Sequence, residues 1–237
     1  MSLEQEYVSR EPRQYTKKEK LANWFYYYKW WLLVALILLY IVGSILWNKL
    51  GIGKTEPDYR LAYIGSTILP EQCREALEKE LARLGEDING DGRVIVEVRQ
   101  YVMAEVQADP ENLAYRYAAE ITLTADISDG ESYFFLMEDP EAFQLNYQVL
   151  AHLDGSIPDD KDFSAKDKTL CWGDCPVLSG LDLGDFEEVY MNRTITGSYQ
   201  ERLSALYFGR RFFDDGTSVK NQEAQERFWN ILTEGAP

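Results

Sequence analysis

Three oxygen-bearing side chains alternate along the segment DINGDG at residues 87–92. Asp87, Asn89 and Asp91 stand at positions 1, 3 and 5 of a tight loop, so their hard oxygens can converge on one point. Gly92, at position 6, permits the sharp turn, and the carbonyl oxygen of Arg93 offers a fourth ligand. Oxygen donors in this spacing are the chemistry that Ca²⁺ prefers.

The pattern resembles the first part of the calcium loops of EF-hands and dockerins, and then departs from it. Position 12 calls for a bidentate acid, but here it is Val98, with Glu97 one place early. The segment that follows has the pattern of a strand, where an EF-hand has a helix. A metal-free turn is the alternative, because Asn-Gly and Asp-Gly pairs favour turns. The ligands expected for a structural calcium ion are Asp87, Asn89, Asp91, Arg93 and Glu97.

The chain has three cysteines. Cys171 and Cys175 are close enough in sequence to close a small disulfide loop outside a cell, to stay as free thiols, or to supply two metal ligands. Cys73 has the helical spacing of Leu77 and Leu81, which predicts a buried core thiol.

Candidate catalytic residues are few. His152 is the only histidine and is expected in the tail of an amphipathic helix, far in sequence from a suggestive serine or cysteine. We therefore predict that the protein is not an enzyme, although a hydrolase that uses carboxylates stays an alternative. Arg210 and Arg211 are adjacent in a predicted strand, so they should point to opposite faces. One is expected to pair with an internal carboxylate, and either could bind an anionic ligand.

The segment from Trp30 to Trp47 carries no charge and lies between Lys29 and Lys49. Its 18 residues span roughly 27 Å as a helix, enough for a bilayer core. Tryptophan and tyrosine gather at its start, and Trp47 marks its end, as in the aromatic belts of membrane helices. No small-residue cleavage site follows, so the segment is predicted to be an uncleaved signal anchor.

The residues on the two sides of this helix differ in charge. Residues 1–29 hold six bases and four acids, a net charge of +2, whereas the remaining 208 residues hold 36 acids and 18 bases, a net charge of −18. The positive-inside rule then predicts a cell-membrane protein with a cytoplasmic N-terminus and an extracytoplasmic C-terminal domain. Such an acidic domain repels nucleic acid, so we expect no nucleic-acid partner.

Four parts follow from these patterns: a basic and aromatic tail (1–29), a transmembrane helix (30–47), a linker (48–58) and an α/β domain (59–237). Strands are expected at 59–65, 93–102, 132–137 and 203–213. Helices are expected at 70–85, 109–125, 139–153 and 222–233, and residues 154–196 are expected to be rich in loops. Strands that alternate with helices predict a single, mostly parallel sheet flanked by helices on both faces.

Ligand sites in such sheets lie beyond the carboxyl ends of the strands. The loops after Gly65, Val102 and Met137 should therefore meet at one edge, with residues 154–196 as a further contributor.

Two stretches carry a family resemblance. The run KKEKLANWFYYYKW at 17–30, one apolar helix, and then EPDY at 56–59 resemble a group of uncharacterised single-pass membrane proteins of Gram-positive bacteria. The resemblance covers roughly residues 17–65 and implies the membrane topology. More loosely, the order of strands and helices is similar to one lobe of a solute-binding protein, which implies a ligand-binding domain.

These features favour a membrane-anchored extracytoplasmic binding or accessory module that is stabilised by calcium. Its partners would be the lipid bilayer, through residues 30–47, and a protein or small molecule outside. The alternatives are a subunit of a membrane complex that acts through protein contacts, and the carboxylate-based hydrolase.

Overall fold

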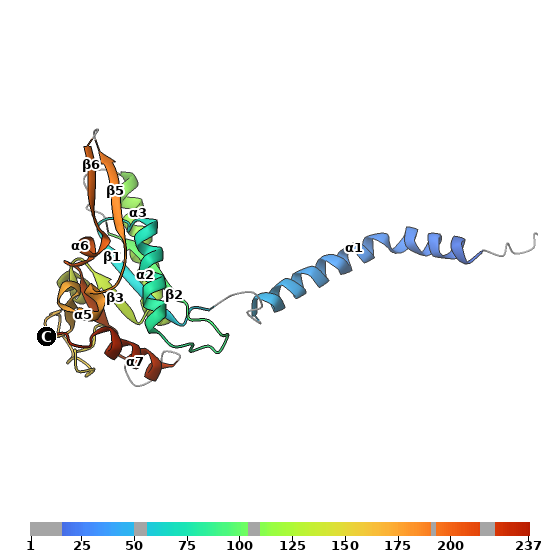
Figure 1. Cartoon of the computed structure of the whole chain (residues 1–237). Helices are drawn as coiled ribbons and strands as arrows, with labels where there is room; N and C mark the ends of the chain where they lie inside the picture. The colour runs from blue at the N-terminus through green and yellow to red at the C-terminus, as the bar shows by residue number, and fades with distance from the viewer. Residues whose placement is uncertain (1–15, 50–55, 104–109, 191–192, 214–220) are drawn as a thin grey trace, which may run out of the picture. The chain divides into compact units, whose positions relative to one another are not determined.

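The structure is a computed structural model and describes residues 16–49, 56–103, 110–190, 193–213 and 221–237 (Figure 1). The chain divides into two compact units, Met1–Thr55 and Glu56–Pro237. The linker expected at 48–58 and the helix start expected at Asp109 lie largely outside the described residues.

The first unit contains one long helix, α1 (Lys17–Lys49). Thr16 and Glu19 form a capping box at its start: the Thr16 amide donates to a Glu19 carboxylate oxygen at 2.9 Å, and the Glu19 amide donates to the Thr16 hydroxyl at 3.4 Å. Its apolar side chains point outward on every side, and most of the described ones are exposed. By length and composition, the part of α1 from Lys17 to Ser44 could cross a membrane.

The second unit is built on a five-stranded sheet with the order β2-β1-β3-β7-β4. Its strands are β1 (Tyr59–Gly65), β2 (Val96–Val102), β3 (Phe134–Met137), β4 (Thr169–Cys171) and β7 (Tyr207–Arg210). β1 pairs in parallel with both β2 and β3, whereas β7 pairs antiparallel with β3 and with β4. The sheet is therefore mixed, and β7 alone among these five strands runs against the others.

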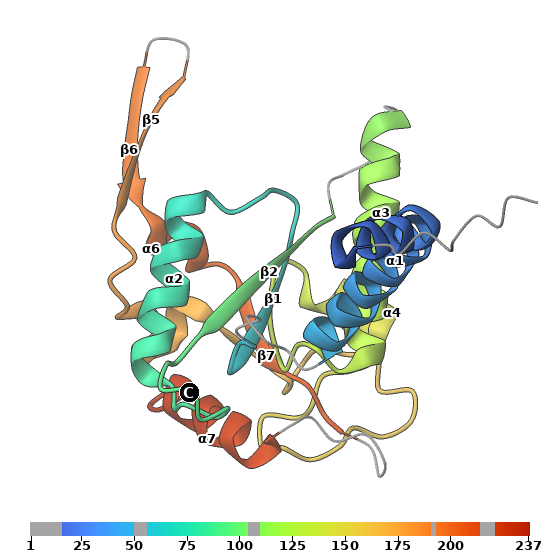
Figure 2. The same ribbon diagram turned by 90° about the vertical axis from the view of Figure 1, so that its right-hand side faces the viewer.

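Helices cover both faces of this sheet, as predicted, because the central strands β1 and β3 present apolar residues to both faces. Tyr59, Leu61 and Tyr63 face the core shared with α2 (Glu71–Leu84) and α7 (Gln222–Leu232). Ala62 and Ile64 face the core shared with α3 (Pro110–Asp129) and α4 (Pro140–Tyr147). Figure 2 shows α2 and α3 on opposite sides of β1 and β2.

Several predicted elements have different bounds: the strands expected at 93–102 and 132–137 start later, at Val96 and Phe134, and the helix expected to end at 125 continues to Asp129. Two further elements differ in a way that moves candidate residues. The helix expected to continue to Leu153 ends at Tyr147, because Gln148 takes a left-handed backbone with φ of 51°. The chain then turns back, and Leu150 forms a bridge with Arg211, so His152 lies beyond the helix and not in its tail. The strand expected at 203–213 is shorter, since residues up to Leu203 belong to the helix α6 (Tyr199–Leu203).

The region expected to be loop-rich holds regular structure besides β4. A short 3₁₀ helix, η1 (Trp172–Asp174), and the helix α5 (Pro176–Ser179) follow that strand. Then β5 (Asp185–Tyr190) and β6 (Arg193–Ser198) pair antiparallel as a separate ribbon. This ribbon extends away from the sheet in Figure 2.

Candidate functional site

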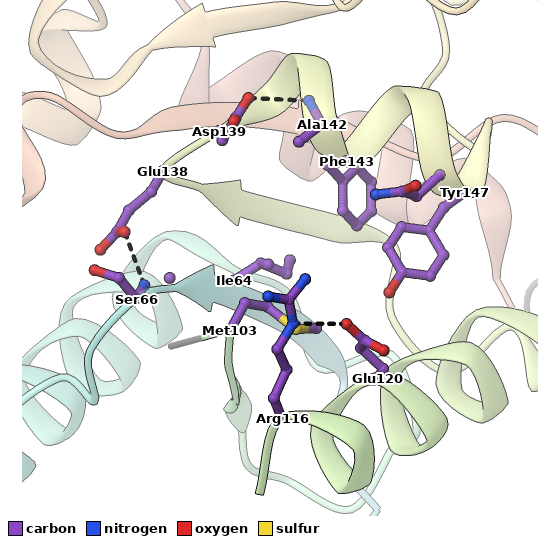
Figure 3. A pocket seen from close by; sticks show the side chains of 12 residues that line it. Ile64, Ser66, Met103, Arg116, Glu120, Glu138, Asp139, Ala142, Phe143 and Tyr147 are labelled. Carbon is purple, nitrogen blue, oxygen red and sulfur yellow. Dashed lines mark hydrogen bonds and ion pairs between the residues drawn. The ribbon is translucent and has the colours of Figure 1, made fainter. Parts of the chain in front are cut away.

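A pocket of about 320 Å³ lies at the carboxyl ends of the three parallel strands (Figure 3). The residues that follow β1, β2 and β3 line it, represented by Ser66, Met103 and Glu138. This is the edge where the strand order predicted a site. Of the segments expected there, residues 154–196 do not line the pocket. The parallel pairing of β1 with both neighbours brings the carboxyl ends of the three strands together.

Glu138 is fixed in place on one side of the pocket. One carboxylate oxygen accepts a hydrogen bond from the Tyr63 hydroxyl at 3.2 Å, and the other accepts one from the Ser66 backbone amide at 2.7 Å. Burial, with Glu138 as a second cause, raises the pKa of Tyr63, so this hydroxyl keeps its proton at neutral pH. The two donors orient the negative charge of Glu138 without neutralising it.

The opposite side of the pocket comes from α3 and α4. Arg116 Nε donates to Glu120 Oε1 at 2.9 Å, one helical turn later on α3. Tyr147 reaches the same side from α4 (Figure 3). Burial raises the pKa of Tyr147, and the charge of Glu120 raises it further. This wall therefore offers a neutral phenol beside an ion pair.

Acidic groups outnumber basic ones around the pocket. Among the described residues, Glu120, Glu138 and Asp139 line it together with one cation, Arg116, so these four side chains carry a net charge of −2. Asp139 also caps α4, since its Oδ1 accepts from the Ala142 amide at 2.9 Å. The floor is apolar and consists of Ile64, Met103 and Phe143. An apolar floor with a few converging acids suits a small organic cation.

The candidate calcium loop lies elsewhere, between α2 and β2, and its acceptors bond to its own backbone. The two carboxylate oxygens of Asp87 accept from the Gly90 and Gly92 amides at 2.7 and 2.8 Å. Asn89 Oδ1 accepts from the amide of Asp91 at 2.9 Å. Gly90 and Gly92 have positive φ angles of 75° and 84°, a left-handed backbone conformation that glycine adopts without steric cost. The Asn89 bond, to the amide two residues on, is an Asx turn, and the two Asp87 bonds close wider turns around the glycines.

The fifth expected ligand does not join the loop. Glu97 lies on β2 and forms ion pairs with Arg60 at 3.0 Å and with Arg99 at 3.2 Å. Among the described residues, no group of three or more histidines, cysteines or acids has the arrangement of a metal site. The Asp91 carboxylate accepts from the Arg93 amide at 2.9 Å.

Asp58 attaches this loop to the start of β1, a role that the sequence reasoning did not predict. Asp58 is only 6% exposed. Its Oδ1 accepts from the backbone amides of Ile88 at 2.8 Å and Asn89 at 3.1 Å, and its Oδ2 accepts from the Ile95 amide at 2.8 Å. The sequence feature that could have indicated this role was an acid between Pro57 and the first strand, where its side chain could accept hydrogen bonds from free backbone amides.

The three cysteines are free. The disulfide that the spacing left open between Cys171 and Cys175 is therefore not formed. Cys175 is buried, and burial raises its pKa to about 11. Cys73 lies in the core with Leu77 and Leu81, as predicted, and burial raises its pKa to about 11 as well.

Arg210 and Arg211 are outside the pocket and lie on opposite faces of the sheet edge. Arg210, 3% exposed, pairs with Glu226 of α7, donates to the Leu153 carbonyl at 2.9 Å, and lies over the Trp229 ring. It is thus the internally paired member that the sequence predicted. Arg211 lies over the Phe213 ring, and burial lowers its pKa. Neither residue lines the pocket.

Comparisons of the chain with protein-family models, with curated proteins and with solved structures found no match. By its fold and its pocket, the second unit belongs to the class of mixed α/β domains, with an acidic pocket at the carboxyl ends of its parallel strands.

Proposed function

We propose that the protein is a membrane-anchored extracytoplasmic binding module that takes a small organic cation in the pocket at the strand ends. The observation that carries the proposal is the lining of the pocket, where three carboxylates face one guanidinium above an apolar floor. A volume of about 320 Å³ is near the lower limit for small-molecule sites, so the ligand is small.

The charge of the rest of the domain supports a cationic ligand. Residues 30–237 carry a net charge of −18, which raises the local concentration of cations and repels anions. Within the pocket, Glu120 already pairs with Arg116. Glu138 and Asp139 accept from Tyr63, Ser66 and Ala142, and their remaining lone pairs can receive the ammonium hydrogen bonds of a ligand, while Tyr147 can cover its carbon chain.

Anchoring through α1 completes the proposal. An apolar helix with outward side chains on all sides is stable in lipid, where its backbone groups bond within the helix. Six bases precede the apolar segment, and Lys49 and Lys54 follow it closely, which favours a cytoplasmic N-terminus. The resemblance to single-pass proteins of Gram-positive bacteria supports the same topology. A C-terminal epitope tag should then be digested by protease added to intact protoplasts, and a tag at the N-terminus should survive.

Ligand binding is tested by calorimetry on the full-length protein in detergent, with spermidine as the cationic probe and succinate as the anionic control. Spermidine should bind and succinate should not. Glu138→Gln removes one charge at nearly constant volume and should weaken binding by about 10–100-fold, since a hydrogen bond to a charged group contributes about 1.5–3 kcal/mol. Glu75→Gln, on the exposed side of α2, is the matched control.

Equal affinities of the wild type and Glu138→Gln for spermidine would refute the assignment of the pocket. Binding of succinate in preference to spermidine would refute the charge argument. A calcium ion in the 87–93 loop remains part of the proposal as a structural element, and it is tested separately by its effect on stability.

A further inference from the structure

Arg116 keeps unused hydrogen-bond donors on the wall of the pocket that α3 forms. Its Nε donates to Glu120 Oε1 at 2.9 Å, while its two Nη groups have no partner among the residues that the structure describes. Figure 3 shows this side chain pointing into the pocket. The bond to Glu120 fixes the plane of the guanidinium, and its outer edge can receive a further acceptor.

A carboxylate is the acceptor that fits this edge. The N–H groups of a guanidinium form a planar fork, to which both oxygens of one carboxylate can bond at once. The two other acids of the pocket do not fill this place, since neither Glu138 nor Asp139 forms an ion pair with Arg116. Arg116 is 41% exposed, so its outer donors are hydrated until a ligand with a carboxylate displaces the water.

The charges around the pocket distinguish between classes of ligand. Glu138 and Asp139 have no cationic partner among the described residues, so each can pair with one ammonium group. A diamine would serve these two acids and leave the outer edge of Arg116 unused. A neutral amino acid would serve Arg116 and leave one acid unpaired. A basic amino acid carries two ammonium groups and one carboxylate, which gives each of the three side chains an opposite charge.

We propose that the pocket takes a basic amino acid of the size of lysine, with its carboxylate on Arg116 and its ammonium groups on Glu138 and Asp139. Such a molecule is one of the small organic cations of the proposed function, on which this assignment rests. Its alkyl chain lies over the apolar floor, and a cavity of about 320 Å³ suits a ligand this small. Its net positive charge keeps the attraction of the acidic domain, which an acidic amino acid would lose.

Lysine and cadaverine are the probes that isolate the carboxylate, because cadaverine is lysine without that group. In calorimetry on the full-length protein in detergent, lysine should bind about 10–100-fold more tightly than cadaverine, the range for hydrogen bonds to a charged group. Norleucine lacks the side-chain ammonium of lysine and should bind at least about tenfold more weakly than lysine.

Variants of Arg116 should change the affinities for the two probes in different directions. Arg116→Gln should weaken lysine by about 10–100-fold and leave cadaverine as tight as before or tighter, because Glu120 is then free to pair with an ammonium group. Arg116→Lys keeps the charge and loses the fork, so its affinity for lysine should fall between those of the wild type and Arg116→Gln. Arg83→Gln is the matched control, since Arg83 is 61% exposed on α2 and pairs with Glu80 one turn earlier.

The outcomes separate this assignment from the proposed function. Equal affinities of the wild type for lysine and cadaverine would overturn the carboxylate contact and leave the cation site standing. An equal loss of both affinities in Arg116→Gln would mean that Arg116 shapes the pocket and does not read the carboxylate. Norleucine binding as tightly as lysine would remove the second ammonium contact. If lysine, cadaverine and spermidine all failed to bind, the proposed function would fail and this assignment with it.

Discussion

Replacing Asp58 by alanine should loosen the 87–93 loop more than any change within the loop itself. The variant removes three acceptor contacts, to the amides of Ile88, Asn89 and Ile95, at 2.8 to 3.1 Å. Hydrogen bonds to charged acceptors contribute about 1.5–3 kcal/mol each, but water can reach part of this loop and the losses do not add. We expect a loss of about 3 kcal/mol, which lowers the melting temperature of a unit of this size by about 6–12 °C.

The assay is differential scanning calorimetry of the full-length protein in detergent and EDTA. Asp91→Ala is the matched control, because its carboxylate accepts one bond, from the Arg93 amide of an exposed turn. That loss should be at most about 1 kcal/mol, or about 2–4 °C. If Asp58→Ala and Asp91→Ala melt at the same temperature, the loop is not held by Asp58 and the reasoning fails. The comparison needs no ligand and no knowledge of the function.

Three further outcomes are expected. If the loop binds calcium, adding the ion at about 100 times its dissociation constant should stabilise the protein by about 2.7 kcal/mol. Asp91→Ala should abolish this stabilisation. Identical melting curves in EDTA and in calcium would indicate a metal-free turn. In iodoacetamide labelling at pH 8, Cys171 should react before Cys73 and Cys175. Burial raises the pKa of those two thiols to about 11, so their thiolates form only as the pH rises toward that value. Mass spectrometry measures the order in which the three cysteines are labelled. Arg210→Ala should cost about 1.5–3 kcal/mol in urea unfolding, because the Leu153 carbonyl and the partly exposed Glu226 carboxylate both lose the buried guanidinium. A loss below about 1 kcal/mol would contradict the pairing.

The parallel part of the sheet could be predicted because its signals are local. β1 and β2 alternate apolar residues between two cores, and Pro140 with its capping Asp139 marks the start of α4. The direction of β7 could not be read in this way, because it depends on pairing with β3, far away in the sequence. A strand pattern shows that a strand forms and does not show which way its neighbour runs.

The ribbon of β5 and β6 was missed for a different reason. Acidic residues interrupt the apolar alternation of β5, so this segment lacks the usual pattern of a half-buried strand. The ribbon also stands apart from the main sheet, and forming it needs little burial of apolar residues. The β-branched residues of β6, Thr194, Ile195 and Thr196, were the available signal. The early end of α4 had no signal of this kind, since Gln148 takes a left-handed backbone that glycine or asparagine usually adopts.

The location of the pocket followed from topology, and its chemistry did not. The carboxyl ends of parallel strands must share an edge, so the loops after Gly65 and Met137 could be placed together. Arg116 and Glu120 were not predicted as lining residues, because the side of α3 that meets the sheet is set by how the helix docks. Their spacing of four residues indicated an ion pair on a helix, but not what it would face.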